Sequence, residues 1–247
     1  MTITAAFTGK SGSGKTTAAK ALLRVIRKKH PDKTVLLFDN DLTAELAYSF
    51  NKDIRKTIYG IRSGKHEYKT PVPEHMTKQE YIEWALEDII EPIDENTDII
   101  VSWLTGSKDC RCPVTKQLND ALIKLISRYD FVIFDCEYDL KYLQQLVDIP
   151  VNVSLIIAAP DEASLSLARR IMDTDSKYCA GGQSGIILNM TDTQNTETQA
   201  QLLKKYEISV LGVIPKDSSL KDNGISKDSE KICSAMEQIY YRLNLPQ

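Results

Sequence analysis

The sequence predicts an α/β fold, a doubly wound and mostly parallel sheet of seven to eight strands with helices on both faces. Short apolar runs alternate with helical patterns along all 247 residues. Several of these runs are apolar at every position, as expected for parallel strands that helices cover on both sides. Such alternation is typical of right-handed β-α-β units in one sheet. No composition change marks a boundary, so we expect a single domain spanning residues 1–247.

The expected elements follow one another in order. Strands are predicted at residues 3–7, 34–38, 98–103, 131–134, 151–158, 185–188 and 210–214. Helices are predicted at residues 16–29, 78–90, 116–128, 163–177, 197–206 and 227–243. The last helix carries an apolar stripe of Ile232, Met236 and Ile239, which should face the sheet. Residues 51–73 are polar, basic and interrupted by Gly and Pro, and we expect a surface loop there.

Composition narrows the classes of function. The formal net charge is −3 with positive residues scattered, so no nucleic-acid-binding surface is expected. No apolar run approaches the roughly 20 residues of a membrane span, and Met1 leads directly into the first strand rather than into a signal peptide. The 5 cysteines are an odd number, unlike a secreted disulfide framework. We therefore expect a cytoplasmic protein without membrane or nucleic-acid partners.

A phosphate-binding loop separates the first strand from the first helix. The motif G-x-x-x-x-G-K-[ST] is complete in Gly9, Gly14, Lys15 and Thr16. Glycines allow backbone N–H groups to approach phosphate oxygens, and the helix N-terminus adds partial positive charge. Lys15 should reach the β- and γ-phosphates, and the Thr16 hydroxyl should face Mg²⁺. The predicted nucleotide-binding segment is Gly9, Lys10, Ser11, Gly12, Ser13, Gly14, Lys15, Thr16 and Thr17.

Carboxylates stand at the ends of two expected strands. Asp39 and Asp41 end the second strand run, and Asp135 follows the apolar run 131–134. Open α/β sheets bind ligands at the carboxyl edge of their strands. Asp135 is therefore expected to hold Mg²⁺ through water. For Asp39 and Asp41 the alternative is an Asx turn or a helix cap at the strand end.

A pair of cysteines precedes the helix expected at 116–128. Cys110 and Cys112 lie one residue apart, followed by Pro113, which suits the first position of a helix. Two thiolates cannot complete a tetrahedral S₄ shell, but two such pairs related by a dimer axis would do so. Thiolate ligands suit Zn²⁺, Cu⁺ or Ni²⁺. The alternative is two cysteines without a metal.

The segment 10–16, Lys-Ser-Gly-Ser-Gly-Lys-Thr, resembles the deviant phosphate loop K-G-G-x-G-K-[ST] of the MinD/ParA class of ATPases. Ser11 replaces the first glycine of that pattern. The resemblance implies that Lys10 reaches across a homodimer interface to the partner's nucleotide, as an arginine finger does. It also assigns Asp39 to the surroundings of Mg²⁺ and Asp41 to orientation of the attacking water.

The same resemblance extends to later parts of the chain. It implies that Asn189 and the residues around Pro215 contact adenine, although each alone is only a turn signal. Tyr138 stands where this class has a glycine in the loop after the strand at 131–134. That glycine commonly donates its N–H to the γ-phosphate, so either slow hydrolysis or an altered switch is expected.

Cys-x-Cys-Pro at 110–113, joined to Asp135-x-Glu137, resembles the CooC family within this class. The similarity extends over nearly the whole chain, through residues 163–171 and the Gly-Val-Ile-Pro of 212–215, with Tyr138 and Asp139 as departures. CooC proteins assist nickel insertion into carbon monoxide dehydrogenase. The resemblance implies a homodimer that closes when ATP and Mg²⁺ bind. This dimer would hold Ni²⁺ or Zn²⁺ between Cys110 and Cys112 of both chains. After hydrolysis of ATP to ADP it would serve a client metalloenzyme, carbon monoxide dehydrogenase or a related one.

Two other functions fit the same residues. One is a positioning ATPase of the MinD/ParA type, although the segment 234–247 has only Arg242 as a cation and makes a poor basic membrane helix. The other is a reductase resembling the nitrogenase iron protein, in which four cysteines of two chains hold a [4Fe–4S] cluster. A GTP-binding protein is disfavoured because no N-K-x-D sequence follows at Asn189.

Overall fold

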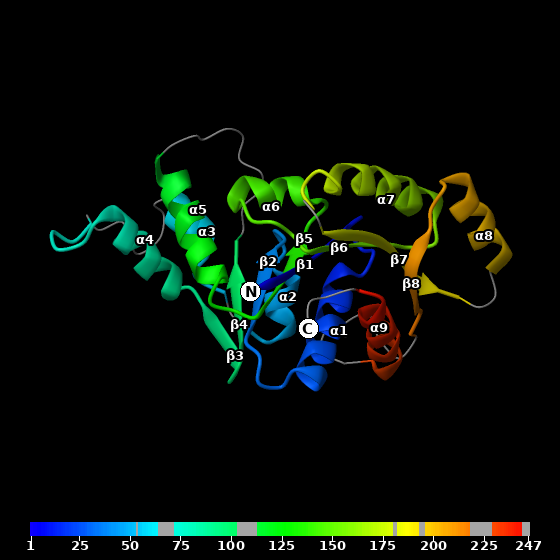
Figure 1. Cartoon of the computed structure of the whole chain (residues 1–247), viewed down its shortest axis with the longest axis horizontal. Helices are drawn as coiled ribbons and strands as arrows, with labels where there is room; N and C mark the ends of the chain where they lie inside the picture. The colour runs from blue at the N-terminus through cyan, green and yellow to red at the C-terminus, as the bar shows by residue number, and fades with distance from the viewer. Residues whose placement is uncertain are drawn as a thin grey trace.

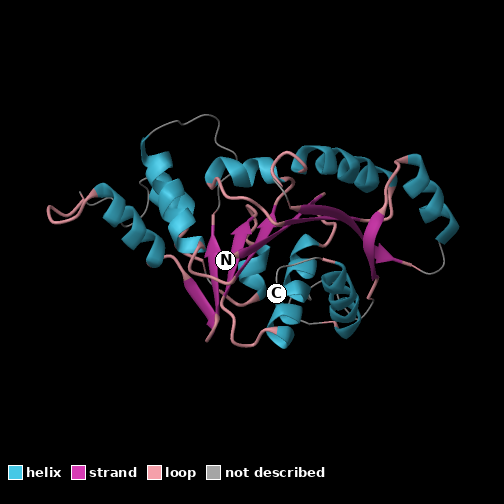
Figure 2. Cartoon of the chain, viewed as in Figure 1, coloured by secondary structure: helices cyan, strands magenta, loops and turns pink. Residues whose placement is uncertain are grey.

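A computed structural model shows one sheet of eight strands in the order β3-β4-β2-β5-β1-β6-β7-β8. It describes residues 1–52, 54–63, 72–102, 113–179, 182–192, 196–217 and 229–243. Among these, β3 pairs with β4 in the antiparallel sense, and the other neighbouring strands run parallel. Figures 1 and 2 show this twisted sheet between two layers of helices. The predicted fold class is confirmed.

The strands are β1 (Ile3–Gly9), β2 (Val35–Asn40), β3 (Glu91–Asp94), β4 (Thr97–Val101), β5 (Phe131–Cys136), β6 (Val153–Ala158), β7 (Gln183–Thr191) and β8 (Val210–Pro215). The helices are α1 (Lys15–Lys29), α2 (Glu45–Ser49), α3 (Ile58–Ser63), α4 (Lys78–Glu87), α5 (Pro113–Ile126), α6 (Leu140–Leu146), α7 (Glu162–Asp175), α8 (Thr196–Lys205) and α9 (Glu230–Arg242).

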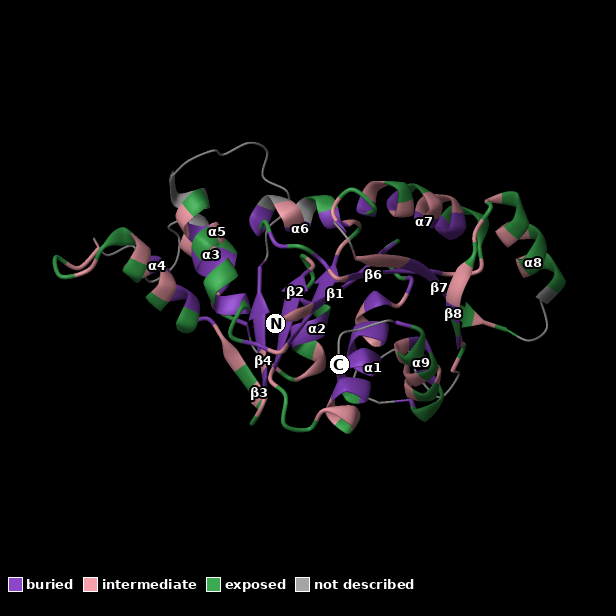
Figure 3. Ribbon diagram, viewed as in Figure 1, coloured by how far each residue is buried: buried purple, intermediate pink, exposed green. Residues whose placement is uncertain are grey.

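The uniformly apolar strands are explained by a core on each face of the sheet. In β1, Ala5 and Phe7 join the core under α1, α2 and α9, whereas Ala6 points into the core under α4, α5 and α6. β2 and β5 alternate in the same way, because successive side chains of a strand point to opposite faces. The central strands are buried along their whole length (Figure 3).

Strand order makes the end of β1 a point where the chain changes its winding direction. This strand lies between β5 and β6, so the chain winds outward from it in both directions. The connections on its two sides leave in opposite directions, and open α/β sheets commonly bind ligands at the carboxyl edge of such a position. The predicted phosphate loop follows β1 directly and therefore lies at this position.

The structure differs from the predictions at short and marginal elements. Strand β3 is additional to the seven predicted strands. Its residues alternate between half-buried and exposed, and it lies at the edge of the sheet. The short helices α2, α3 and α6 were not predicted, because five to seven residues carry too little periodicity. The surface-loop prediction for 51–73 is wrong for its described first half, since Ile54 and Ile58 are buried. Residues 64–71 of that stretch lie outside the described residues.

None of the described helices is long and apolar enough to span a membrane.

Candidate nucleotide-binding site

Two glycines give the phosphate loop its shape. Gly9 has a φ of +132°, and a Cβ there would lie 2.3 Å from the carbonyl oxygen of Ile157. Gly14 has a φ of +93°, and a Cβ there would lie 2.2 Å from Nδ2 of Asn189. Both the left-handed conformation and the close neighbours exclude a larger residue. The packing and backbone geometry of the loop thus require both glycines of the motif.

The beginning of α1 is arranged to receive an anion. No side chain among the described residues caps this helix, and its first turn has no acidic residue. Its first N–H groups therefore face the loop, where the helix dipole favours negative charge. Lys15 is only 6% exposed, and its Nζ donates to the Lys10 carbonyl at 3.3 Å. Ser13 is buried, and its Oγ has no hydrogen-bond partner within the described part of the chain.

Thr16 and Asp135 meet as a magnesium site requires. The Thr16 hydroxyl donates to Asp135 Oδ2 at 2.7 Å. The other oxygen, Oδ1, is buried and has no hydrogen-bond partner within the described residues. Burial raises the pKa of Asp135 to about 7, although the Thr16 hydrogen bond and the charge of Lys15 both lower it. A buried carboxylate with one unused oxygen, next to a threonine hydroxyl, fits a divalent cation and its bound water.

Asp39 lies beside Asp135 but is already engaged by backbone groups. The two residues are direct neighbours in the register of β2 and β5. Asp39 accepts N–H groups from Asp41 at 3.2 Å and from Ala47 at 3.0 Å. Burial and the charge of Asp135 raise the pKa of Asp39 to about 8. These hydrogen bonds hold Asp39 to the loop 39–47. The unused oxygen of Asp135 is therefore the better ligand for a cation.

Asp41 forms an Asx-type turn, which was the alternative to a functional role for this residue. Its Oδ1 accepts the backbone N–H of Thr43 at 2.8 Å and the Thr43 hydroxyl at 2.7 Å. The chain then passes through Ala44 in the left-handed region, with a φ of 50°. Orientation of an attacking water by Asp41 stays a prediction.

The Lys10 side chain is largely exposed to solvent and lies near Asp161. Its Nζ lies 3.9 Å from Oδ1 of Asp161, and the two side chains are 45% and 51% exposed. Ser11 and Gly12 beside it are also exposed. An ion pair this open contributes little to stability. Lys10 is therefore free to leave Asp161 for another anion.

Asn189 packs on the phosphate loop itself. Its Nδ2 donates to the carbonyl of Ser13 at 2.7 Å, a contact between residues far apart in sequence that the sequence did not reveal. Met190 follows with a φ of 57°, and Pro215 is the neighbour of Thr191 across β7 and β8. Asn189 and Pro215 thus end adjacent strands near the loop. Their contact with adenine stays a prediction.

A model of the CobQ/CobB/MinD/ParA nucleotide binding domain matches residues 4–229. The chain belongs to this family. Among curated proteins it is 23% identical over 220 residues to the uncharacterized ATP-binding protein MJ0685 of Methanocaldococcus jannaschii, covering 88% of this chain and 86% of that protein.

Solved structures of the CobQ/CobB/MinD/ParA family share this fold. The septum site-determining protein MinD of Pyrococcus horikoshii, complexed with Mg-ADP, is 21% identical, with a TM-score of 0.65 and coverage of 97% of this chain and 94% of that one. A ParA family ATPase of Chlorobium tepidum is 17% identical, with a TM-score of 0.68 and coverage of 99% and 100%. At these identities the likeness establishes the fold.

The cysteines of this family member fall into two groups. Cys110 and Cys112 lie outside the described residues, so their predicted metal site stays a prediction. Within the described ranges no group of three or more His, Cys, Asp or Glu side chains is placed to hold a metal ion. Cys136 is fully buried, and burial raises the pKa of its thiol well above the usual range. Cys136 therefore packs as a core residue.

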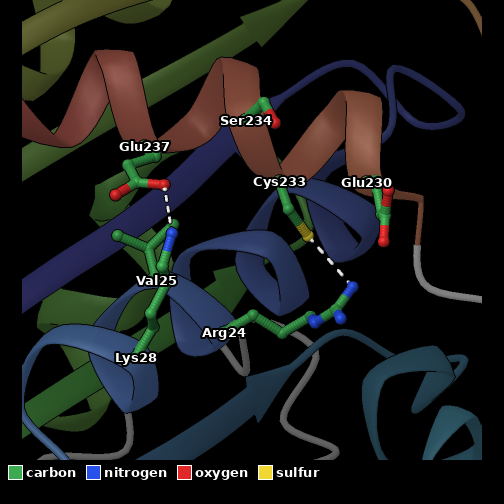
Figure 4. A pocket seen from close by; sticks show the side chains of 7 residues that line it. All are labelled: Arg24, Val25, Lys28, Glu230, Cys233, Ser234 and Glu237. Atoms are coloured by element: carbon green, nitrogen blue, oxygen red, sulfur yellow. Dashed lines mark hydrogen bonds and ion pairs between the residues drawn. The ribbon is translucent and has the colours of Figure 1, made fainter.

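A hollow of about 420 Å³ lies between α1 and α9, away from the phosphate loop (Figure 4). Arg24 Nη1 donates to Cys233 Sγ at 3.3 Å, and Lys28 pairs with Glu237 at 3.0 Å across it. Two cations and two carboxylates line its walls. Because its charges are balanced, the hollow presents no net field that would select an anion or a cation.

Proposed function

We propose that this protein is a Mg²⁺-dependent ATPase that acts as a homodimeric switch, as one domain over residues 1–247. The hydrogen bond between Thr16 and Asp135, with the second Asp135 oxygen unused, carries this proposal. Family membership supports nucleotide binding, and the curated relative described as ATP-binding supports ATP.

Each residue of the site has a distinct role in this proposal. The loop glycines and the N-terminus of α1 hold the phosphates by backbone N–H groups, and Lys15 neutralises them. Asp135 and Thr16 hold Mg²⁺, which when bound neutralises charge on the phosphoryl group being transferred. Lys10 leaves Asp161 and contacts the nucleotide of the partner subunit. Asp41 leaves its turn with Thr43 and orients water.

Hydrolysis of ATP and GTP, with and without Mg²⁺, tests this proposal directly. We expect slow ATP hydrolysis that EDTA abolishes, with GTP turned over more slowly than ATP. Slow turnover is expected because Tyr138 replaces a glycine, and its carbonyl already accepts the Gly9 N–H at 2.7 Å. Mass measurements with ADP and with a non-hydrolysable ATP analogue check the dimer. An absence of Mg-nucleotide binding would contradict the proposal.

We further propose that the cargo of this switch is a metal ion held by Cys110 and Cys112 of both subunits, for delivery to carbon monoxide dehydrogenase or a related metalloenzyme. The motif Cys-x-Cys-Pro joined to Asp135-x-Glu137 supports it. Nucleotide state and metal affinity would then be reciprocally coupled. A positioning ATPase of the MinD/ParA type and an iron–sulfur reductase are the alternatives that the same fold accommodates.

Substitution of both cysteines separates these three functions. For Cys110→Ser/Cys112→Ser we expect loss of one Ni²⁺ or Zn²⁺ per dimer under anaerobic conditions, with Mg-ADP affinity unchanged. Cys233→Ser is the matched control, since its thiol lies on α9 and should leave the metal bound. Metal analysis and native mass spectrometry provide the measurement. Iron with sulfide would indicate the reductase, and no metal in the wild type would indicate a different cargo.

A further inference from the structure

Asp175 is a buried carboxylate that the proposed nucleotide site does not use. It is the last residue of α7 and is 0% exposed. Its Oδ2 accepts the hydroxyls of Thr8 at 3.1 Å and Ser154 at 2.7 Å, and its Oδ1 accepts the backbone N–H of Leu140 at 3.0 Å. Four segments remote in sequence, β1, β6, α6 and α7, therefore meet at one side chain.

The position is an unfavourable one for a negative charge. All three donors are uncharged groups, so the carboxylate loses water without gaining a cation from them. The C-terminal turn of a helix also disfavours an anion, because its carbonyl groups carry partial negative charge. Consistent with this, burial raises the pKa of Asp175 to about 6. The carboxylate nevertheless accepts all three hydrogen bonds, and an apolar side chain would leave these buried donors without an acceptor.

Two of the three donors, Thr8 and Leu140, lie next to the two moving parts of the proposed switch. Thr8 immediately precedes Gly9, the first residue of the phosphate loop. Leu140 begins α6, directly after the turn 136–139 that contains Tyr138. The same turn is held at its other side, where the Tyr138 carbonyl accepts the Gly9 N–H at 2.7 Å. The turn is thus joined to the end of β1 by one direct contact and by one contact through Asp175.

We propose that Asp175 is a positioning residue that couples the phosphate loop to the turn 136–139 by binding Thr8 and the Leu140 N–H at the same time. A change in the loop on nucleotide binding then reaches the turn through this carboxylate. Ser154 anchors the carboxylate to β6, which belongs to neither moving part.

Asp175→Asn tests the coupling with little change in shape. An amide can accept the Leu140 N–H only with its oxygen, and its NH₂ group must then face the Thr8 and Ser154 hydroxyls. We expect amide hydrogen exchange over residues 137–142 to become about tenfold faster in the nucleotide-free variant. Ser154→Ala is the matched control and should leave exchange in this segment within about twofold, because it keeps both links.

The kinetic part of the test rests on the proposed ATPase function. We expect kcat for ATP hydrolysis to fall about tenfold in Asp175→Asn while the Kd for Mg-ADP stays within about threefold, because geometry rather than phosphate contact is lost. A residue with only a structural role would lower stability without this separation of kcat from Kd. Should Asp175→Asn fail to fold, Thr8→Val cuts the link to β1 alone and is expected to lower kcat in the same way.

The outcomes are distinguishable. Unchanged exchange over 137–142 in Asp175→Asn, or faster exchange with kcat unchanged, overturns the coupling. Absence of ATP hydrolysis in the wild type overturns the proposed function instead. In that case, amide hydrogen exchange over residues 137–142, measured with and without Mg-ADP, decides whether the coupling exists. The coupling predicts that Mg-ADP changes this exchange in the wild type and in Ser154→Ala but not in Asp175→Asn.

Discussion

Asp135→Asn is expected to lower Mg²⁺-dependent ATP hydrolysis about 10- to 100-fold and, in the metal-free protein, to make the fold more stable. Activity falls because the amide is a weaker partner for Mg²⁺ and its water. Stability rises because burial holds the pKa of Asp135 at about 7, so folding at neutral pH retains a costly buried charge. At pH 8 we expect a gain of about 2–4 kcal/mol in the free energy of unfolding.

The sign of the pH dependence separates this effect from general stabilisation. The folded protein binds the Asp135 proton more tightly than the unfolded chain, whose pKa is near 3.8. Its contribution to wild-type stability is therefore complete below pH 3.8 and is lost as the pH rises toward about 7. The gain in Asp135→Asn should accordingly grow with pH. Denaturant unfolding in EDTA at several pH values measures it.

Asp130→Asn is the matched control because its shift has the opposite sign. The hydrogen bond from Lys33 and the backbone N–H of Thr34 lower the pKa of Asp130. The Asp130 carboxylate contributes stability above its unfolded pKa, and the contribution is lost as pH falls through the folded pKa. This variant should lose stability at neutral pH and little in acid. If Asp135→Asn behaved like Asp130→Asn, the destabilising effect of the buried Asp135 charge at the proposed magnesium site would be refuted.

Lys15→Met and Lys10→Met are expected to have opposite profiles. Lys15 is buried beside the loop, so its loss should weaken Mg-ADP binding by about 2–5 kcal/mol, or at least about 30-fold in Kd. Lys10 faces solvent and pairs only loosely with Asp161. Lys10→Met should leave the Kd for Mg-ADP within about threefold and lower ATP hydrolysis about 10³-fold, the range of a finger residue supplied in trans.

Calorimetric titration with Mg-ADP and a steady-state ATPase assay distinguish the two lysines. Mixing Lys10→Met with a variant impaired in its own nucleotide site, Lys15→Met, adds a stringent check. If Lys10 acts on the partner's nucleotide, each mixed dimer regains one complete active site, about half the activity of a wild-type dimer. Equal weakening of Mg-ADP binding by both substitutions would place Lys10 on the nucleotide of its own subunit and contradict action in trans.

Much of the fold follows from local patterns in the sequence. The seven predicted strands are all present, because uninterrupted apolar runs such as that of β5 survive only between two layers of helices. The phosphate loop could also be predicted from the sequence, because its backbone geometry requires Gly9 and Gly14 whatever surrounds them. The edge strand β3 and the helix α3 were missed because their stability comes from packing on β4 and α4 rather than from their own periodicity.

The sequence by itself determined the fold class and the chemistry of the site: a phosphate loop, and carboxylates at strand ends. Only the tertiary structure decided which polar groups meet. It brought Asn189 onto Ser13, left one oxygen of Asp135 unused, and gathered Thr8, Leu140 and Ser154 around Asp175. The physical reason is the separation along the sequence. Helix and strand patterns repeat within a few residues, whereas these contacts join residues 21–176 positions apart and depend on how the layers pack.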